Sequence, residues 1–228
     1  AWAAVYAVLI YYLYTPYTKG LGFTEGQAAT MIAAMGAANS LFVIVGSWLS
    51  DRVMGSRSAL VIGNIVKAIA FGMFAIPTVS IGQGRVFAVI GLILMSLPIM
   101  GASNASLTGL LYRREDSGRR DAAFTIHTVA NAIAGVIAPA LVGNLSANNY
   151  HIGFAIGSVW ALAYGFIIFI TRNKFFGTIG AKPASPLSPA EKQKFIRIAV
   201  IVAVVAAALI GGTYALGVLS FDGIINVL

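Results

Sequence analysis

Residues 28–57 read AATMIAAMGAANSLFVIVGSWLSDRVMGSR, a run without charge that ends in an aspartate and two arginines. A helix needs about 20 mostly apolar residues to cross the hydrocarbon core of a bilayer, and Ala28–Ser50 has that length and composition. Asp51, Arg52 and Arg57 then follow where the lipid headgroups would lie. The stretch therefore predicts a membrane-crossing helix and the turn that ends it.

The composition places the whole chain in the same class. Of its 228 residues, 59% are hydrophobic and 10% are charged, whereas a soluble domain carries about 25% charged residues. Cysteine is absent, which excludes disulfides and thiolate chemistry, and two isolated histidines make no metal-ligand cluster. No nucleotide-binding or other enzyme motif is present. We therefore expect no enzyme, no cofactor and no metal site.

Seven apolar stretches predict an all-α, polytopic membrane protein. The first is short and its start lies in apolar sequence, so we expect it to be a truncated span of a longer protein. Thr24 with Gln27, and Ser188 with Glu191, have the spacing of a capping box at a helix start. The predicted spans are Ala1–Tyr14, Ala28–Ser50, Ala59–Pro77, Val86–Tyr112, Ala122–Gly143, Ile152–Thr171 and Ile198–Leu219.

The basic residues predict the orientation of these spans. The formal net charge is +8, and the charges lie in short segments between apolar runs, which favours membrane orientation over nucleic-acid binding. Only Lys19 and Arg85 fall on one side of the predicted membrane. By the positive-inside rule, the opposite side faces the cytoplasm, and so does the N-terminus. That side holds Arg52, Arg57, Arg113, Arg114, Arg119, Arg120, Arg172, Lys174, Lys182, Lys192, Lys194 and Arg197.

The turn after the second span is a candidate gate. A carboxylate at a helix end can pair with a neighbouring helix or its positive N-terminal end, and such a pair can hold one packing state and release it in another. The alternative is an ordinary juxtamembrane turn with arginines that extend to the interface. The candidate gate residues are Gly46, Asp51, Arg52, Gly55 and Arg57.

Lys67 stands in the middle of the third span. A lysine near the bilayer centre costs about 2.5–3.5 kcal/mol on insertion scales, so it generally has a functional site or a specific partner. The apolar runs contain no acidic residue that could pair with it. Its partner would then be the substrate, other sequence or a solvated cavity; the alternative is a local packing role.

His127 and Asn131 lie one turn apart in the fifth span and are predicted to share one surface. Histidine changes its charge near physiological pH, as a proton-coupled carrier requires; a hydrogen bond between helices is the alternative role. Further polar residues inside spans must find partners within the bundle, either as contacts between helices or as ligand contacts. These are Asn39, Ser40, Ser103 and Asn104.

Several stretches resemble, in order along nearly the whole chain, the N-terminal half of the bacterial proton-dependent oligopeptide transporters, a family of the major facilitator superfamily. Residues 46–57 (GSWLSDRVMGSR) resemble its loop between helices two and three. Residues 20–28 (GLGFTEGQA), 119–126 (RRDAAFTI), 150–154 (YHIGF) and 182–188 (KPASPLS) resemble its entries to helices two, five and six and the linker that follows.

The resemblance fails at positions that face substrate in this family. Two family tyrosines fall on Trp2 and Ala3, an arginine on Tyr6, a pocket tyrosine on Ser40 and a lysine on Gly101. The family's Glu-x-x-Glu-Arg motif for proton coupling would precede Ala1. Because a lost cation removes a strong partner for a carboxylate, either the substrate differs from an ordinary dipeptide or another residue, such as Lys67, supplies the charge.

The resemblance implies a six-helix N-terminal bundle (1–171), a cytoplasmic linker (172–197) and an accessory transmembrane helix (198–228). It implies proton-coupled symport of di- or tripeptides across the inner (plasma) membrane, with a small peptide, protons, the lipid bilayer and a missing C-terminal bundle as partners. Two alternatives stay open. One is a carrier of this superfamily for a different small solute, and the other is a non-transporting membrane protein built from half a carrier.

Overall fold

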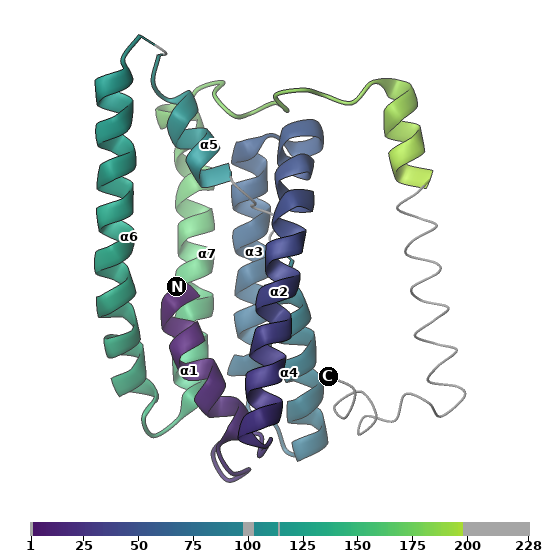
Figure 1. Cartoon of the computed structure of the whole chain (residues 1–228), viewed down its shortest axis with the longest axis vertical. Coiled ribbons are helices and arrows are strands. Elements are labelled where there is room, and N and C mark those ends of the chain that lie inside the picture. Colours follow the sequence, from purple (N-terminus) through teal and green to yellow (C-terminus); the bar gives the residue numbers. More distant parts are fainter. Residues whose placement is uncertain (1, 98–102, 114, 198–228) are drawn as a thin grey trace. The chain divides into compact units, whose positions relative to one another are not determined.

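The computed structural model describes residues 2–97, 103–113 and 115–197. The chain forms two compact units, Ala1–Ala184 and Ser185–Leu228, and each is described by itself. The elements of the first unit, labelled in Figure 1, are α1 (Trp2–Tyr14), α2 (Glu25–Leu49), the π-helix η1 (Ser50–Met54), α3 (Ser56–Ala75), α4 (Ile81–Met95), α5 (Ser103–Leu110), α6 (Ser117–Ser146) and α7 (Tyr150–Phe175).

Four segments within the described ranges are long and apolar enough to cross a membrane. Two shorter apolar helices correspond to the first and fourth predicted spans, and the seventh predicted span, Ile198–Leu219, lies outside the described residues. The long segments are Glu25–Met54, Ser56–Ala75, Ser117–Ser146 and Tyr150–Phe175, and the short ones are Val5–Tyr14 and Ile81–Met95.

The fourth span is not the single helix predicted over Val86–Tyr112. Its helix α4 begins earlier, at Ile81, because the Ser80 hydroxyl caps it by accepting a hydrogen bond from the Gln83 amide. Leu97 is not helical, and Pro98 follows it in the sequence. A residue before proline is pushed away from the helical region, which explains why a continuous apolar run does not give a continuous helix.

Local signals at the helix starts are confirmed. The Thr24 hydroxyl accepts from the Gln27 amide at 3.2 Å, and the Gln27 side chain accepts from the Thr24 amide at 3.0 Å. In the second unit, Ser188 and Glu191 exchange the same pair of bonds ahead of the helix over 189–197. Both starts are fixed by residues three apart, which is why the sequence alone predicts them.

The core of the first unit lies along α3 and α7, which make the most extensive helix contact. Phe71, Phe74 and Phe154 are fully buried there, and the ring centroids of Phe74 and Phe154 are 5.1 Å apart. Gly157 of α7 sits against Val5 of α1 and Phe71 of α3, with no room for a side chain. Small residues at such points let helix backbones approach closely in a membrane.

The outward face of α6 is apolar and uncovered. Ile126 and Val136 are 70% and 75% exposed, and no charged side chain occurs in α6 beyond Asp121. A surface of this kind suits contact with lipid or with another helical bundle. The opposite face of α6 carries His127, Asn131 and Ala134, which form one wall of the site described next.

Candidate functional site

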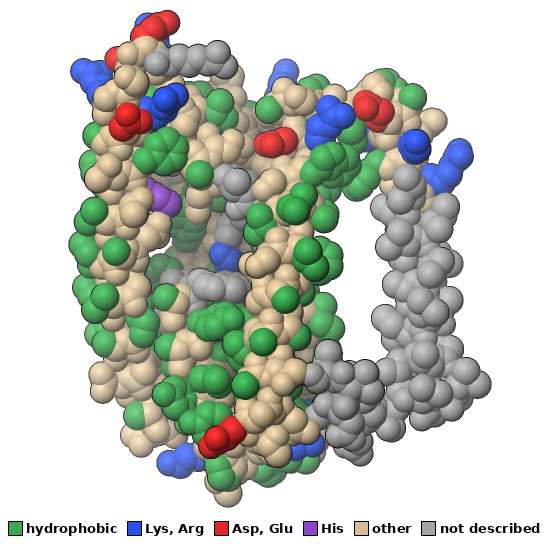
Figure 2. Space-filling view, in the orientation of Figure 1, with side chains coloured by type: hydrophobic (Ala, Val, Ile, Leu, Met, Phe, Trp, Pro, Cys, Tyr) green, Lys and Arg blue, Asp and Glu red, His purple; other side chains and the backbone are tan. Residues whose placement is uncertain are grey.

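A cavity of about 520 Å³ opens between α3, α5, α6 and α7. In the face shown in Figure 2, a hollow lies between α6 and α2. A histidine lies at its α6 edge and a basic side chain lies inside it. Four of the polar residues predicted from the sequence line this cavity, from three different helices. The lining residues are Ala3, Asn64, Lys67, Asn104, His127, Asn131, Ala134, Gly135, Ala138, Trp160, Ala161 and Tyr164.

The α3 wall carries Lys67 and, one turn before it, Asn64. Lys67 is half-buried and Asn64 is buried. The Asn64 amide nitrogen donates to the Leu60 carbonyl of its own helix at 2.7 Å, so this side chain is held in a fixed position beside the lysine. Residues three apart share a helix face, which is why both reach the same cavity.

The α6 wall carries His127 and Asn131. The Asn131 amide nitrogen lies 3.3 Å from the His127 ring nitrogens. The four-residue spacing predicts that the two share a surface, and they do. Ala134, Gly135 and Ala138 continue this wall with small side chains that leave room beside the polar pair.

The α7 wall was not predicted. Trp160 and Tyr164 line the cavity from α7, and the Tyr164 hydroxyl donates to Oδ1 of Asn104 on α5 at 3.2 Å. A signal was present in the sequence, because aromatic residues with a polar atom, one turn apart in the middle of an apolar span, need a polar partner. The partner itself could not be found, since it lies 60 residues away.

Tyr6 and Asn39 belong to a second cavity of about 500 Å³, between α1 and α2, which they line with Ala3, Ala7, Met35 and Gly36. The Asn39 amide nitrogen donates to the Met95 carbonyl of α4 at 3.3 Å. Asn39 thus joins two helices, one of the two roles predicted for it. Ala3 lines both cavities, so they share α1 as a boundary.

Among the remaining pocket candidates, Ser40 lines neither described cavity. Ser40 is exposed, and its hydroxyl donates to the Gly36 carbonyl of its own helix at 3.0 Å. Trp2 and Ser103 begin α1 and α5, but their side chains lie outside what the structure describes, as does Gly101. Among the described residues, no group of three or more His, Cys, Asp or Glu could hold a metal ion.

The candidate gate residues lie at one end of α2 and α3. Asp51 was predicted to end a helix, but the chain stays helical through Met54, as the π-helix η1. The turn comes at Gly55, whose φ of +81° suits glycine. A Cβ there would also lie 2.8 Å from the Gly180 carbonyl oxygen. Gly46 is buried within α2, and Asp51 is exposed.

Arg57 attaches the segment after α7 to the start of α3. One guanidinium nitrogen, Nη1, donates to the Arg172 carbonyl at 3.0 Å and to the Gly177 carbonyl at 2.8 Å. The Arg57 amide donates to the Gly180 carbonyl at 3.0 Å. The Arg172 carbonyl also accepts from the Phe176 amide at 3.3 Å, so the arginine adds a second donor at the end of α7 and ties the segment that follows α7 to α3.

Comparisons with known proteins agree with this all-helical fold. The Major Facilitator Superfamily profile matches residues 1–226. The di-/tripeptide transporter of Lactococcus lactis subsp. cremoris is 32% identical over 204 residues, 88% of this chain and 40% of that protein. An uncharacterized transporter of Bacillus subtilis (strain 168), YclF, is 35% identical over 207 residues, 90% of this chain and 40% of that protein.

Solved structures give the same result. Peptide transporter POT in complex with sulfate superposes with a TM-score of 0.90 at 29% identity, over 99% of this chain and 46% of that one. A POT family transporter in complex with 5-aminolevulinic acid superposes with a TM-score of 0.86 at 27% identity, over 98% and 45%. The chain spans about 40–46% of the length of these relatives.

The chain therefore belongs to the Major Facilitator Superfamily, a class of multi-pass membrane transporters and not of enzymes. Within that superfamily it is related to the bacterial POT-family di-/tripeptide transporters and corresponds to roughly the N-terminal 40–46% of them. The family resemblance read from the sequence is thus confirmed, and the all-helical fold matches the N-terminal part of POT structures.

Proposed function

We propose that this chain is the N-terminal bundle of a proton-coupled symporter of di- or tripeptides that works by alternating access. The observation that carries the proposal is the 32% identity to a di-/tripeptide transporter across 88% of the chain. The polar cavity within an otherwise apolar bundle supports it. In carriers of this kind the substrate lies near the bilayer midplane, between two repeats.

The proposal makes this chain one wall of the transport site. The relatives are more than twice as long as the part that matches, which fits a second bundle that faces the α6 wall and supplies the other wall. The exposed apolar side chains of α6, among them Ile126 and Val136, suit such a contact. The domain division proposed is a bundle over 1–171, a linker over 172–197 and an accessory helix over 198–228.

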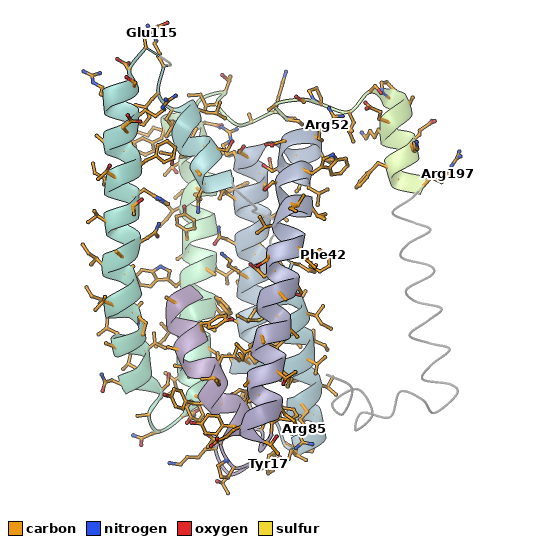
Figure 3. The ribbon with its side chains drawn as sticks, viewed as in Figure 1. Tyr17, Phe42, Arg52, Arg85, Glu115 and Arg197 are labelled. Carbon is orange, nitrogen blue, oxygen red and sulfur yellow. The ribbon has the colours of Figure 1, made fainter. Side chains whose placement is uncertain are left out.

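The proposed orientation puts the N-terminus in the cytoplasm of a bacterial cell, with the protein in the inner membrane. Figure 3 shows Arg52 and Glu115 at one end of the first unit and Tyr17 and Arg85 at the other. The end with Arg52 holds most of the basic residues, which supports a cytoplasmic location. Asp51 would act there as part of a gate between packing states.

His127 is the proposed proton-coupling residue of this half. It lines the cavity beside Asn131, and a gain of charge at this position would change the electrostatics of the wall that faces the substrate. A glutamate motif ahead of Ala1, as the family resemblance implies, would be a second proton site. The residues ahead of Ala1 in the full-length protein are therefore the most informative further sequence.

The direct test is uptake of labelled dipeptides by the purified full-length protein in liposomes. A proton-coupled carrier should accumulate peptide when the outside is more acidic than the lumen, and a proton uncoupler should remove the accumulation. Liposomes with the related transporter of Lactococcus lactis serve as the positive control. A folded protein that takes up no peptide at any pH gradient would refute the proposal.

A different small solute is the second candidate, on the same scaffold. It is favoured by the pocket positions at which the family resemblance fails, Tyr6, Ser40 and Gly101. One relative has been solved with 5-aminolevulinic acid, which shows that a POT family protein can hold such a molecule. A thermal-shift screen of peptides against nitrate, amino acids and organic acids would separate the two candidates.

A further inference from the structure

We infer that a groove between α3 and α7 binds one anionic phospholipid, with an acyl chain in the groove and the phosphate at Arg172. The groove has a volume of about 580 Å³ and shares no lining residue with the polar cavity. Only the choice of leaflet, the cytoplasmic one, rests on the proposed function and its orientation. The lining of this α3–α7 groove includes Val61 and Ile65 of α3 and Val159, Leu162, Phe166 and Phe169 of α7.

The lining of the α3–α7 groove is entirely apolar. Ala163 and Gly165 complete it, so no lining side chain can donate or accept a hydrogen bond. A polar solute would lose its hydration there without a replacement, whereas a hydrocarbon chain has none to lose. The volume lies within the range of about 300–1,000 Å³ that is common for ligand sites. The groove therefore suits a hydrocarbon chain.

The α3–α7 groove has a floor and is open to the surroundings of the bundle. Gly165 is buried, and a Cβ at that position would lie 3.1 Å from the Asn64 Cβ of α3. The two helices thus approach closely at Gly165, and no side chain from it fills the groove. Val159 and Phe166 are 65% and 62% exposed. In a bilayer, such an open apolar surface lies against lipid.

The groove and the polar cavity lie on different faces of the same two helices. On α3, Lys67 lines the cavity and Ile65 lines the groove. On α7, Tyr164 lines the cavity, and Leu162 and Phe166 line the groove. A ligand in the groove would therefore contact the helices that carry the cavity wall without entering the cavity.

Basic residues gather at one end of the α3–α7 groove. The guanidinium carbon of Arg172 lies 4.0 Å from the ring centroid of Phe169, which places the charge beside a lining residue. Arg57, one turn before Val61, donates to the Arg172 carbonyl at 3.0 Å, and Lys174 is exposed at the end of α7. Neither α3 nor α7 contains an aspartate or a glutamate. This end of the helix pair is therefore positively charged.

The charge selects the class of lipid. A guanidinium matches the oxygens of a phosphate with two parallel hydrogen bonds, and basic pockets between helices on the cytoplasmic side of a membrane bind anionic headgroups. Phosphatidylcholine has a phosphate too, but its own ammonium group offsets the attraction. An anionic lipid such as phosphatidylglycerol gains the full interaction, with its phosphate at Arg172 and a chain along the groove.

Two other occupants would bring like charges together. A second copy in a two-fold dimer would place the same patch, with Arg172 and Lys174, on both sides of the contact. The predicted span 198–219 of this chain is preceded by Lys192, Lys194 and Arg197, which would meet the basic end of the groove. Like charges repel strongly where the dielectric constant is low, so a lipid phosphate is the better partner.

The test measures lipid binding to the purified full-length protein by native mass spectrometry. Dioleoylphosphatidylglycerol and dioleoylphosphatidylcholine are titrated separately in detergent, and the dissociation constant of the first bound lipid is compared. We expect the phosphatidylglycerol to bind about tenfold more tightly, the effect of one or two basic residues at a membrane surface. Equal affinity for the two lipids would overturn the inference, and this wild-type comparison decides even if a variant fails to fold.

Two variants locate the lipid. Arg172→Gln with Lys174→Gln should remove the preference for phosphatidylglycerol, whereas Arg119→Gln, an exposed arginine of α6, should keep it. Ala163→Phe should fill the groove and weaken the binding of both lipids. Ala155→Phe is its matched control, because Ala155 is also exposed on α7 and lines neither the groove nor the described cavities. A double variant with the full preference would overturn the inference.

The same spectra separate the rival ligands and occupants. Glycerol 3-phosphate, which has the phosphate without the chains, should not displace the bound lipid; displacement would reduce the site to an anion site and overturn the role of the groove. Ala163→Phe that turns a dimer into a monomer with unchanged lipid binding would instead make the groove an interface between copies. None of these measurements involves uptake, so the lipid site and peptide transport stand or fall separately.

Discussion

The hydroxyl of Tyr164 on α7 donates a hydrogen bond to Oδ1 of Asn104 on α5, at 3.2 Å. The bond joins two helices that the sequence separates by 60 residues, and both residues line the cavity that holds Lys67. This hydrogen bond links the packing of the bundle to the wall of the proposed site. It holds α5 against α7, and it also orients the Asn104 amide in the cavity wall.

Tyr164→Phe should therefore weaken transport without unfolding the protein. A hydrogen bond of this kind contributes about 1 kcal/mol, which corresponds to a fall of about fivefold in peptide uptake at low substrate concentration. Initial uptake rates in liposomes give the measurement. Tyr11→Phe is the matched control, since Tyr11 is 52% exposed on α1 and lines neither described cavity. Unchanged uptake by Tyr164→Phe would remove Tyr164 from the site.

Asp51→Asn should slow the transport cycle more than it weakens binding. A carboxylate paired with a helix end contributes about 0.3–2 kcal/mol, so we expect a fall of about two- to thirtyfold in turnover with an unchanged dissociation constant. Uptake kinetics and a binding titration on the same preparation separate the two. Asp116→Asn is the control, because Asp116 precedes α6 without a side-chain capping bond. Equal turnover in wild type and Asp51→Asn would exclude a gating role.

Arg57→Ala should destabilise the first unit. The variant loses both side-chain hydrogen bonds to the Arg172 and Gly177 carbonyls, and bonds from a charged donor are worth about 1.5–3 kcal/mol each when they are not open to solvent. Because one of these bonds is exposed, we expect a loss of about 1–3 kcal/mol, seen as a lower melting temperature in detergent. Arg113→Ala, at an exposed position of the same end, should melt like the wild type.

Gly157→Ala should destabilise the bundle, and Val5→Ala should partly rescue it. A methyl group at Gly157 would collide with the Val5 side chain, and overpacking costs about 1–3 kcal/mol. A double-mutant cycle of melting temperatures measures the coupling. Gly143→Ala should raise the melting temperature instead. A methyl group there meets nothing within 4 Å, and alanine favours a helix over glycine by about 0.5–1 kcal/mol. Additive effects of the two substitutions would show that Gly157 and Val5 do not clash.

The sequence predicts the features of this structure that depend on near neighbours. The capping bonds of Thr24 with Gln27, and of Ser188 with Glu191, span three residues. The pairing of His127 with Asn131 spans four, within one helix. In each case, the helical period alone brings the partners together, so no knowledge of the fold is required.

The features that escaped prediction depend on tertiary packing. Asn104 was singled out as a polar residue in a span, but its partner Tyr164 becomes a neighbour only when α5 and α7 pack. Tyr6 and Asn39 were grouped with Lys67 as pocket candidates, yet they line a different cavity. Helix periodicity shows that a residue faces inward and does not show which of several interior spaces it reaches.

The attachment of Arg57 also determines how the chain can be engineered. Residues 177–182 fall in the linker of the proposed division but are attached to the bundle, because Arg57 donates to the Gly177 and Gly180 carbonyls and Ile179 packs on the cluster of Leu60, Leu107 and Ile168. The tether between the two units is accordingly shorter than the run of loop-like sequence after α7. A fluorescent tag or protease site inserted after Ala184 should leave the bundle intact. The same insertion at Gly177 should break the contact between the end of α7 and the start of α3.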